Sequence, residues 1–355
     1  MLYIVFTTGK CNLKCSYCGG SFPQHKVPWS IQYRAEDIKN VVERDPDATV
    51  AFYGGEPLLN AEYIKWFMDN VKARRFVIQT NGTLYHLLPD SYWLRFETVL
   101  LSIDGRPEVT DKHRGWGVYR KVLEAAGHLR SIGFRGDLVA RMTVTEDSDI
   151  YEDVKHLLEL RLFDHVHWQL DVVWSDRWRN FEKWRDESYI PGLRKLMRLW
   201  IAEIRSGKVL GIAPFKAIAS QAIFGDVYTA PPCGSGVNSV SILTNGRVKA
   251  CPIAVEEAWA DLGDIARGLR LKANWIRQPC TQCSYFRYCG GRCLYAYMER
   301  YWGDKGFQEI CKASKELVKL VLSATPLIID MLDRGVIKKN DLLYPTFNNT
   351  VEVIP

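Results

Sequence analysis

The chain has 355 residues, 47% of them apolar and 25% charged, which is the composition of a globular protein long enough for two domains. The net charge of +6 is modest and no dense basic block occurs, so the charge pattern does not indicate nucleic-acid binding. Apolar stretches are short, and the N-terminus lacks signal-peptide features. We therefore expect a cytoplasmic protein without a membrane span, whose ten cysteines bind metal rather than form disulfides.

The first 170 residues alternate between short apolar runs, typical of strands, and longer amphipathic runs, typical of helices. The predicted strands are Leu2–Phe6, Thr49–Tyr53, Phe76–Thr80, Val99–Ile103, Leu138–Val144 and Val166–Val172. The predicted helices between them include Ala61–Lys72, Tyr119–Ser131 and Tyr151–Glu159. This alternation predicts an α/β fold with a parallel sheet that curves into a partial (β/α)6 barrel. Ligands of such folds bind at the carboxyl ends of the strands.

The rest of the chain changes character at Cys233, where cysteines, glycines and short strands become frequent. Thr244-Asn245-Gly246 is a good hairpin signal between strand-like runs. The predicted elements are helices over Gly192–Arg205 and Phe215–Phe224, strands over Ser239–Leu243 and Arg247–Ala250, and a closing helix over Lys312–Ser323 that Pro326 interrupts. We accordingly divide the chain into a core domain (residues 1–210), a cysteine-rich domain (211–325) and a C-terminal tail (326–355).

Cys11, Cys15 and Cys18 form a CxxxCxxC motif directly after the first predicted strand. Three thiolates on one loop can ligate three irons of a 4Fe–4S cube and leave the fourth iron open for a substrate or cofactor. The alternatives are a structural zinc site and a simple electron-transfer cluster. Zinc normally takes four ligands from paired knuckles, which three cysteines without a nearby fourth fit poorly.

The run CNLKCSYC around these cysteines resembles the signature loop of the radical S-adenosylmethionine (SAM) superfamily. The resemblance covers about residues 1–172. It implies that the open iron binds the amino and carboxylate groups of SAM, whose reductive cleavage gives a 5′-deoxyadenosyl radical that abstracts hydrogen from a substrate. The cofactors carry this chemistry, and the protein positions and shields them.

Further matches to the superfamily follow in chain order. Tyr17 matches the position that packs on the adenine, and Gly54-Gly55-Glu56 resembles the GGE motif that holds the methionyl amino group. Glycines allow close backbone approach, and an anionic glutamate suits an ammonium group. The resemblance extends SAM binding to Gln79, Asn81, Ser102, Asp104 and Arg114. A guanidinium suits a carboxylate, although an ion pair at Arg114 and a turn cap at Asp104 are the ordinary alternatives.

The other seven cysteines have the spacing C-x12-G-x4-C, a gap, C-x2-C-x5-C-x3-C, and a last cysteine, which resembles the SPASM extension of peptide- and protein-modifying radical SAM enzymes. The resemblance implies two auxiliary 4Fe–4S clusters and therefore three clusters in all. The first auxiliary set is Cys280, Cys283, Cys289 and Cys311, and the second is Cys233, Cys251 and Cys293. A zinc knuckle is the alternative for the central spacing.

Two departures from the relatives bear on chemistry. The second auxiliary set lacks a fourth cysteine, so either another ligand such as Asp226 or Tyr228 completes it or one iron is open. Sulfatase-maturing relatives place an Asp that acts as a catalytic base directly after the second motif cysteine. Here Pro252 follows Cys251, which disfavours formylglycine formation. Gln169 and Asp171, near the end of the sixth strand, are the candidate catalytic residues, with solvent-facing polar residues as the alternative.

These patterns favour radical modification of a peptide or protein, by crosslinking or another oxidation. The expected partners are that substrate and a reducing protein such as ferredoxin or flavodoxin. No segment precedes the first strand, so we expect no built-in leader-binding module. The alternatives are dehydrogenation of a small molecule and a non-catalytic iron–sulfur electron carrier; a carrier would not need the GGE, Ser102 and Arg114 set.

Overall fold

The computed structural model describes residues 1–175, 178–225, 228–271, 275–344 and 355. Its strands form one sheet in the order β10-β9-β8-β7-β1-β2-β3-β4-β5-β6. The strands are β1 Leu2–Thr8, β2 Thr49–Gly54, β3 Arg75–Thr80, β4 Thr98–Ser102, β5 Asp137–Val144, β6 His165–Leu170, β7 Ser239–Ile242, β8 Arg247–Lys249, β9 Asp261–Asp264 and β10 Gly268–Leu269.

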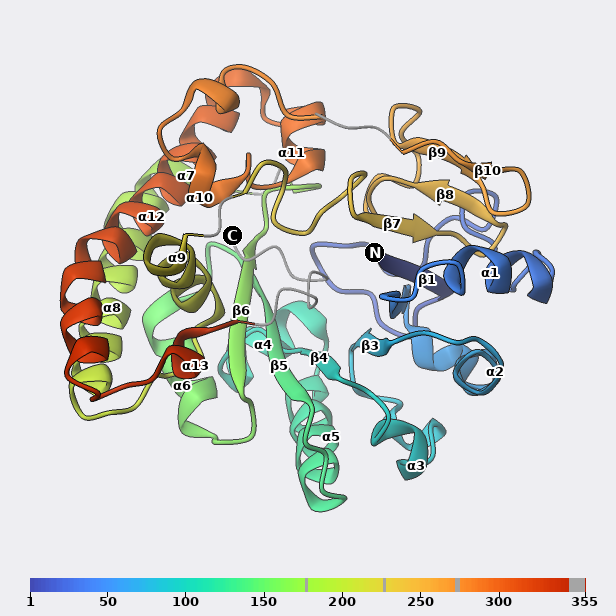
Figure 1. The fold of residues 1–355 in the computed structure, drawn as a ribbon, viewed down its shortest axis with the longest axis horizontal. Coiled ribbons are helices and arrows are strands. Elements are labelled where there is room, and N and C mark those ends of the chain that lie inside the picture. Colours follow the sequence, from blue (N-terminus) through green and yellow to red (C-terminus); the bar gives the residue numbers. More distant parts are fainter. Residues whose placement is uncertain (176–177, 226–227, 272–274, 345–354) are drawn as a thin grey trace.

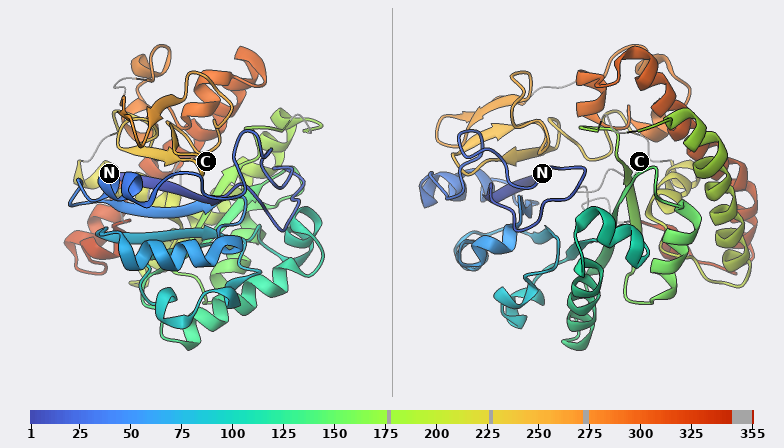
Figure 2. Two further views of the ribbon diagram at one scale, coloured as in Figure 1. Left: turned by 90° about the vertical axis from the view of Figure 1, so that its right-hand side faces the viewer. Right: turned by 180° about the vertical axis from the view of Figure 1, so that it is seen from behind.

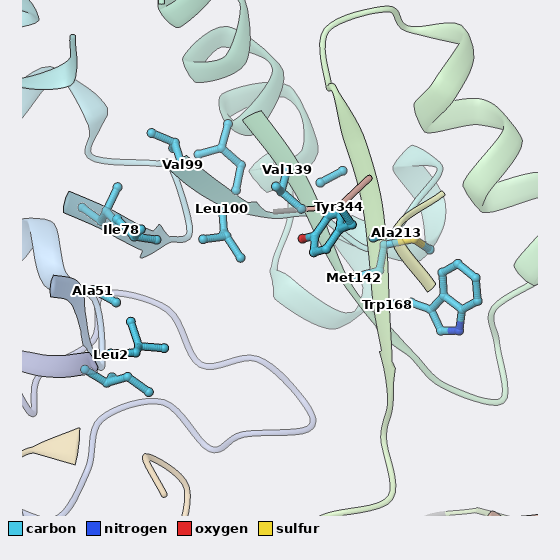
Figure 3. Packing of buried hydrophobic residues seen from close by; sticks show 14 of the residues in the cluster. Leu2, Ala51, Ile78, Val99, Leu100, Val139, Met142, Trp168, Ala213 and Tyr344 are labelled. Carbon is cyan, nitrogen blue, oxygen red and sulfur yellow. The ribbon is translucent and has the colours of Figure 1, made fainter. Parts of the chain in front are cut away.

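Strands β1 to β6 pair in parallel, each with the next along the chain, and curve into an open barrel (Figure 1). All six predicted strands are confirmed, with ends that differ by one or two residues. β1 is buried along its whole length because it pairs with a strand on each edge, β2 and β7, and because other elements pack on both of its faces. Figure 3 shows apolar side chains of successive strands, from Leu2 to Trp168, packed in one core.

Most helices cover the outer face of the barrel strands, whereas the short helices within residues 280–299 belong to the cysteine-rich extension (Figure 1). In the first half they are α1 Ala35–Val42, η1 Pro57–Asn60, α2 Ala61–Asn70, η2 Tyr85–Leu87, α3 Asp90–Trp93, α4 Pro107–Arg114, α5 Val118–Ser131 and α6 Ile150–Glu159. In the second half they are α7 Phe181–Trp184, η3 Arg185–Tyr189, α8 Ile190–Arg205, α9 Ala213–Phe224, η4 Cys280–Gln282, α10 Phe286–Cys289, α11 Leu294–Glu299, α12 Gly303–Asp333 and α13 Lys339–Leu342. None of the helices in the described ranges is both long and apolar enough to span a membrane.

The predicted hairpin is confirmed, and it extends the barrel sheet instead of forming a separate one. β7 pairs in parallel with β1, with Leu2 opposite Ser239, and β8 then pairs antiparallel with β7. The extension lies over the start of the chain in both views of Figure 2. A buried hydrogen bond from the Thr244 hydroxyl to the Pro28 carbonyl (2.7 Å) joins the hairpin to the N-terminal loop. The cysteine-rich region therefore shares a core with the barrel.

The expectation that Pro326 ends the closing helix is wrong, because α12 continues to Asp333. A proline removes the N–H that would bond to the carbonyl four residues earlier, here Leu322. The hydroxyl of Thr325 donates to that carbonyl at 2.7 Å and replaces the missing bond. Beyond the proline, the buried Ile328 and Met331 continue the apolar face that begins earlier in the helix. α12 runs beside α8 in every view (Figures 1 and 2). A domain division between residues 325 and 326 would cut this helix.

Candidate functional site

A cavity of about 690 Å³ lies at the carboxyl ends of the barrel strands. Its walls come from the N-terminal cysteine loop, the ends of β2 to β6, and the segments that contain Cys233 and Cys251. Every residue predicted to contact SAM lines it except Asp104, and both predicted catalytic residues line it. The fold therefore gathers in one place residues as far apart in the chain as Ile4 and Tyr295.

The cysteine loop presents Cys11, Cys15 and Cys18 to this cavity. The amide of Cys18 donates to the Cys15 carbonyl (3.2 Å), so the last two cysteines share one tight turn. Burial raises the pKa of Cys11 to about 11, and a hydrogen bond from the Cys15 thiol lowers the pKa of Cys18 to about 6. Three thiols on one short loop, turned to one cavity, fit the three-thiolate face of a 4Fe–4S cluster.

The GGE motif lies directly against this loop. Gly54 has φ +138°, and a Cβ there would lie 2.2 Å from the Thr8 carbonyl oxygen. A Cβ on Gly55 would lie 2.4 Å from the Lys10 carbonyl oxygen. The end of β2 can therefore pass close to the cysteine loop only without side chains at these two positions. The amide of Glu56 donates to the same Lys10 carbonyl (2.9 Å) and fixes the contact.

Glu56 is the buried acid of the cavity, with 1% of its surface exposed. Its carboxylate accepts hydrogen bonds from the Thr80 hydroxyl (2.6 Å) and from the amides of Asn81 (2.8 Å) and Leu58 (3.0 Å). Burial raises its pKa to about 7, against these hydrogen bonds, which lower it. A cation in the cavity would favour the ionised carboxylate, and so Glu56 fits the ammonium group that was predicted for it.

Arg114 and Asp104 form a buried pair in which the guanidinium Nε and Nη2 contact the two carboxylate oxygens at 2.9 and 2.7 Å. The Tyr17 hydroxyl donates to the same carboxylate (2.7 Å), and the guanidinium lies 5.4 Å from the Tyr17 ring centre. The carboxylate raises the pKa of Arg114 against the cost of burial. Asp104 is fully buried behind Arg114 and does not line the cavity. Its direct contact with SAM stays a prediction, while its observed contacts orient Arg114 and Tyr17.

Three more predicted residues stand on neighbouring strands. Gln79 is the second-to-last residue of β3, and Ser102 is the last residue of β4. Both line the cavity. Asn81 follows β3 and is almost fully buried. Its side-chain amide donates to the Asn12 side chain (2.8 Å), so it ties the end of β3 to the cysteine loop.

Strands β5 and β6 also contribute to the cavity wall. Gln169 on β6 pairs with Thr143 on β5, and Asp171 directly follows β6. Both predicted catalytic residues line the cavity and are partly exposed, and their catalytic role stays a prediction. Arg141 lies two residues before Thr143 and contacts the Nδ1 of His167 (3.0 Å). Because arginine only donates, that nitrogen accepts and the imidazole proton is on Nε2.

The second cysteine field separates into two places. Burial and the neighbouring Cys289, Cys311 and Cys283 raise the pKa of Cys280 to about 12, so these four thiols are close together, away from the cavity. They have no disulfide, and their grouping matches the set predicted for one cluster. Cys311 is carried by α12 and Cys289 ends α10.

Two of the three remaining cysteines line the cavity itself. Cys233 and Cys251 line it, and buried Cys293 precedes the cavity residue Tyr295 by two positions. Of the two non-cysteine ligands considered for this set, Asp226 lies outside the described residues. The Tyr228 amide donates to the Arg287 carbonyl (2.9 Å), which holds the chain there beside α10.

Several cavity residues were not predicted from the sequence. They are Tyr53, Arg141, Trp174, Glu257 and Tyr295. Tyr53 adjoins the GGE motif and could have been found from that position. Tyr295 follows Cys293 by two positions, whereas the other three have no motif beside them and only the assembled fold brings them to the cavity.

Comparison with known proteins supports this architecture. Residues 5–161 match the Radical SAM superfamily. The cysteine-type anaerobic sulfatase-maturating enzyme of Clostridium perfringens (strain 13 / Type A) is 22% identical over 345 residues, which cover 86% of this chain and 92% of that enzyme. The corresponding enzyme of Clostridium novyi (strain NT) is 24% identical over 60% of this chain and 63% of its own length.

Two solved structures share the fold. Native anSMEcpe with bound AdoMet and the Cp18Cys peptide has a TM-score of 0.72 and 22% identity, covering 94% of this chain and 99% of that one. Streptococcus suis SuiB bound to the precursor peptide SuiA has a TM-score of 0.52 and 14% identity, covering 84% and 72%. Residues 5–161 therefore form the radical SAM domain of an enzyme whose cofactors are SAM and 4Fe–4S clusters, and the cysteine-rich extension that follows has SPASM-type spacing.

Proposed function

We propose that this protein oxidises a residue of a peptide or protein substrate bound in the cavity. The observation that carries the proposal is that one cavity is lined both by the CxxxCxxC thiols and by Cys233 and Cys251 of the extension. A substrate held there has a site for hydrogen abstraction on one side and a site that can take up an electron on the other.

The residues divide the work by position. Cys11, Cys15 and Cys18 would hold the cluster that, when bound, reductively cleaves SAM to a 5′-deoxyadenosyl radical. Glu56 would hold the methionyl ammonium, because its carboxylate is buried and faces the cavity. Arg114 lines the cavity with its guanidinium already oriented by Asp104, ready to meet a carboxylate.

The two sets of the extension would have different tasks. Cys280, Cys283, Cys289 and Cys311 would hold a cluster apart from the cavity, suited to passing electrons. Cys233, Cys251 and Cys293 would hold one at the cavity wall, suited to receiving an electron from the substrate. Gln169 and Asp171 line the same cavity and would contact the substrate. A reducing protein of the ferredoxin or flavodoxin class, in the same cytoplasmic compartment, would supply the first electron.

A peptide substrate is supported by the relatives. The similar enzymes mature sulfatases, and two structures of the same fold contain peptides. Pro252 after Cys251 argues for a product other than formylglycine, such as a crosslink or another side-chain oxidation.

The test is anaerobic reconstitution of the full chain with iron, sulfide, SAM and a reductant. Synthetic peptides that present each standard amino acid in turn at the central position would be incubated with it and examined by mass spectrometry. Loss of hydrogen from at least one peptide, dependent on SAM, is the expected result. SAM cleavage with every peptide unchanged, together with turnover of a small-molecule amine or alcohol, would contradict the proposal.

A further inference from the structure

The end of β2 carries a tyrosine whose place in the cavity the SAM chemistry does not explain. Tyr53 lines the cavity one residue before Gly54, and its ring packs edge-on against Phe6 at 5.2 Å. Among the residues that the structure describes, its hydroxyl has no hydrogen-bond partner. A half-buried phenol normally finds a partner, so one that faces a cavity is free to bind what enters it.

The hydroxyl of Tyr53 lies near thiols of both cysteine sets that line the cavity. β2 ends against the cysteine loop through the contact of Glu56 with Lys10. The thiols of Cys18, Cys251 and Cys11 each act electrostatically on the Tyr53 hydroxyl, so thiols of both sets are near it.

The chemical state of the hydroxyl follows from the same neighbours. Burial is the main cause that raises the pKa of Tyr53 to about 12, and the thiols add to it while the Arg141 guanidinium opposes it. At neutral pH the hydroxyl is therefore protonated and cannot serve as a base. It can donate a hydrogen bond to a carbonyl, hydroxyl, thiol or thiolate of a substrate.

We propose that Tyr53 is a substrate-contacting residue, whose hydroxyl donates a hydrogen bond to the reacting residue of the peptide and holds it between the two cysteine sets. This inference rests on the proposed function, because it requires a peptide in the cavity. A substrate held on one side by such a bond keeps a single carbon within reach of hydrogen abstraction. A substrate without the bond moves, and SAM is then cleaved without product.

The test uses the Tyr53→Phe variant, which removes only the hydroxyl and keeps the ring contact with Phe6. The matched control is Tyr3→Phe on β1. Tyr3 is buried with its pKa also raised to about 12, but it lies on the opposite face of the strand from the cavity residue Ile4. The probe is the synthetic peptide that wild-type enzyme modifies best in the set described above, labelled for fluorescence anisotropy.

Two quantities are measured on cluster-loaded protein. One is the affinity of the labelled peptide for unreduced enzyme saturated with SAM, which involves no turnover. The other is the 5′-deoxyadenosine formed per peptide modified. In Tyr53→Phe we expect peptide binding to weaken about fivefold and the ratio to rise by a similar factor, the usual effect of one lost hydrogen bond. Tyr3→Phe should match the wild type in both.

A second variant separates hydrogen bonding from packing. Tyr53→Gln loses the ring but keeps a hydrogen-bond donor. Its SAM cleavage should therefore be better coupled to product, with less 5′-deoxyadenosine formed per peptide modified, than that of Tyr53→Phe. If it is worse coupled, ring packing explains the effect and the proposal is overturned. Equal binding and coupling in Tyr53→Phe and wild type would also overturn it while leaving peptide modification intact. If wild-type enzyme modifies no peptide of the set, the proposed function fails first, and this inference fails with it.

Discussion

The two cysteine regions of this protein are organised in opposite ways. Cys11, Cys15 and Cys18 lie on one loop, and backbone hydrogen bonds within that loop set their spacing. The cysteines of the extension lie on either side of a hairpin, on or next to short helices, and on α12, and they meet only because those elements pack. The local motif therefore depends on its loop and on the strand ends that hold the loop, whereas the distributed motif depends on the packing of the C-terminal half.

The strongest test of this contrast is Cys15→Ala. We expect wild-type protein to hold about twelve irons, and Cys15→Ala to lose about four and to form no 5′-deoxyadenosine, because no neighbouring cysteine can replace this ligand. Iron analysis and chromatography of the SAM products measure both. The matched variant Cys289→Ala should lose iron from the extension and still cleave SAM. Undiminished SAM cleavage by Cys15→Ala would contradict the assignment of this loop.

The local site should also respond to pH through Glu56. Its pKa is raised from 4.5 to about 7 by burial, so the carboxyl retains a proton that the unfolded chain releases between these values. Its contribution to stability is complete below pH 4.5 and is lost as the pH rises through about 7. SAM binding needs the ionised form, so we expect affinity to be about tenfold higher at pH 8 than at pH 6.

Calorimetric titration with SAM at several pH values measures this dependence. The Glu56→Gln variant should bind SAM weakly at every pH, since its amide cannot ionise. The control Glu62→Gln changes an exposed acid on the neighbouring helix and should keep the wild-type profile. A profile that is flat in the wild type would show that Glu56 does not hold the ammonium group.

The distributed site should be sensitive to a change that touches no cysteine. Arg185 is buried and pairs with Glu309 on α12, two residues before Cys311. Arg185→Gln would leave the Glu309 carboxylate without this partner and should lower the free energy of unfolding by about 2 kcal/mol. We expect iron to be lost from the extension while the SAM cluster remains.

Denaturant unfolding with iron analysis tests this expectation. The exposed pair of Lys319 and Glu316 lies on the same helix, and Lys319→Gln should have no measurable effect on either quantity. Equal loss of iron from both regions in Arg185→Gln would mean that they are not independent in stability.

The smallest expected effect concerns the contacts between the two regions. Thr244→Val removes the buried hydrogen bond to the Pro28 carbonyl and should cost about 1 kcal/mol of unfolding free energy. Lys26→Ala removes an exposed ion pair with Glu256 across the same boundary, at 3.9 Å, and should cost less. Thermal or denaturant unfolding of both variants gives the comparison, and a larger loss for Lys26→Ala would contradict it.

The sequence alone determined the barrel strands, the helices between them and the loop of the first three cysteines. Each of these depends on residues that are neighbours along the chain, so alternation, apolar periodicity and motif spacing report them directly. The same holds for the hairpin at Asn245, whose turn chemistry is local. The prediction from the sequence was wrong at Pro326, where the helix continues. The Thr325 hydroxyl that replaces the missing hydrogen bond has no signature in a pattern that treats proline as a helix end.

Only the tertiary structure decided what meets in the cavity. It placed Cys251 near Tyr53, joined β7 to β1, and turned Asp104 toward Arg114 and away from the cavity. The first two of these contacts join residues that are distant along the chain. Asp104 and Arg114 are close in sequence, and the burial of Asp104 decided that it contacts Arg114 instead of the cavity. Such choices depend on the packing of the whole core, in which each side chain is fixed by neighbours from other elements, and no local pattern encodes them.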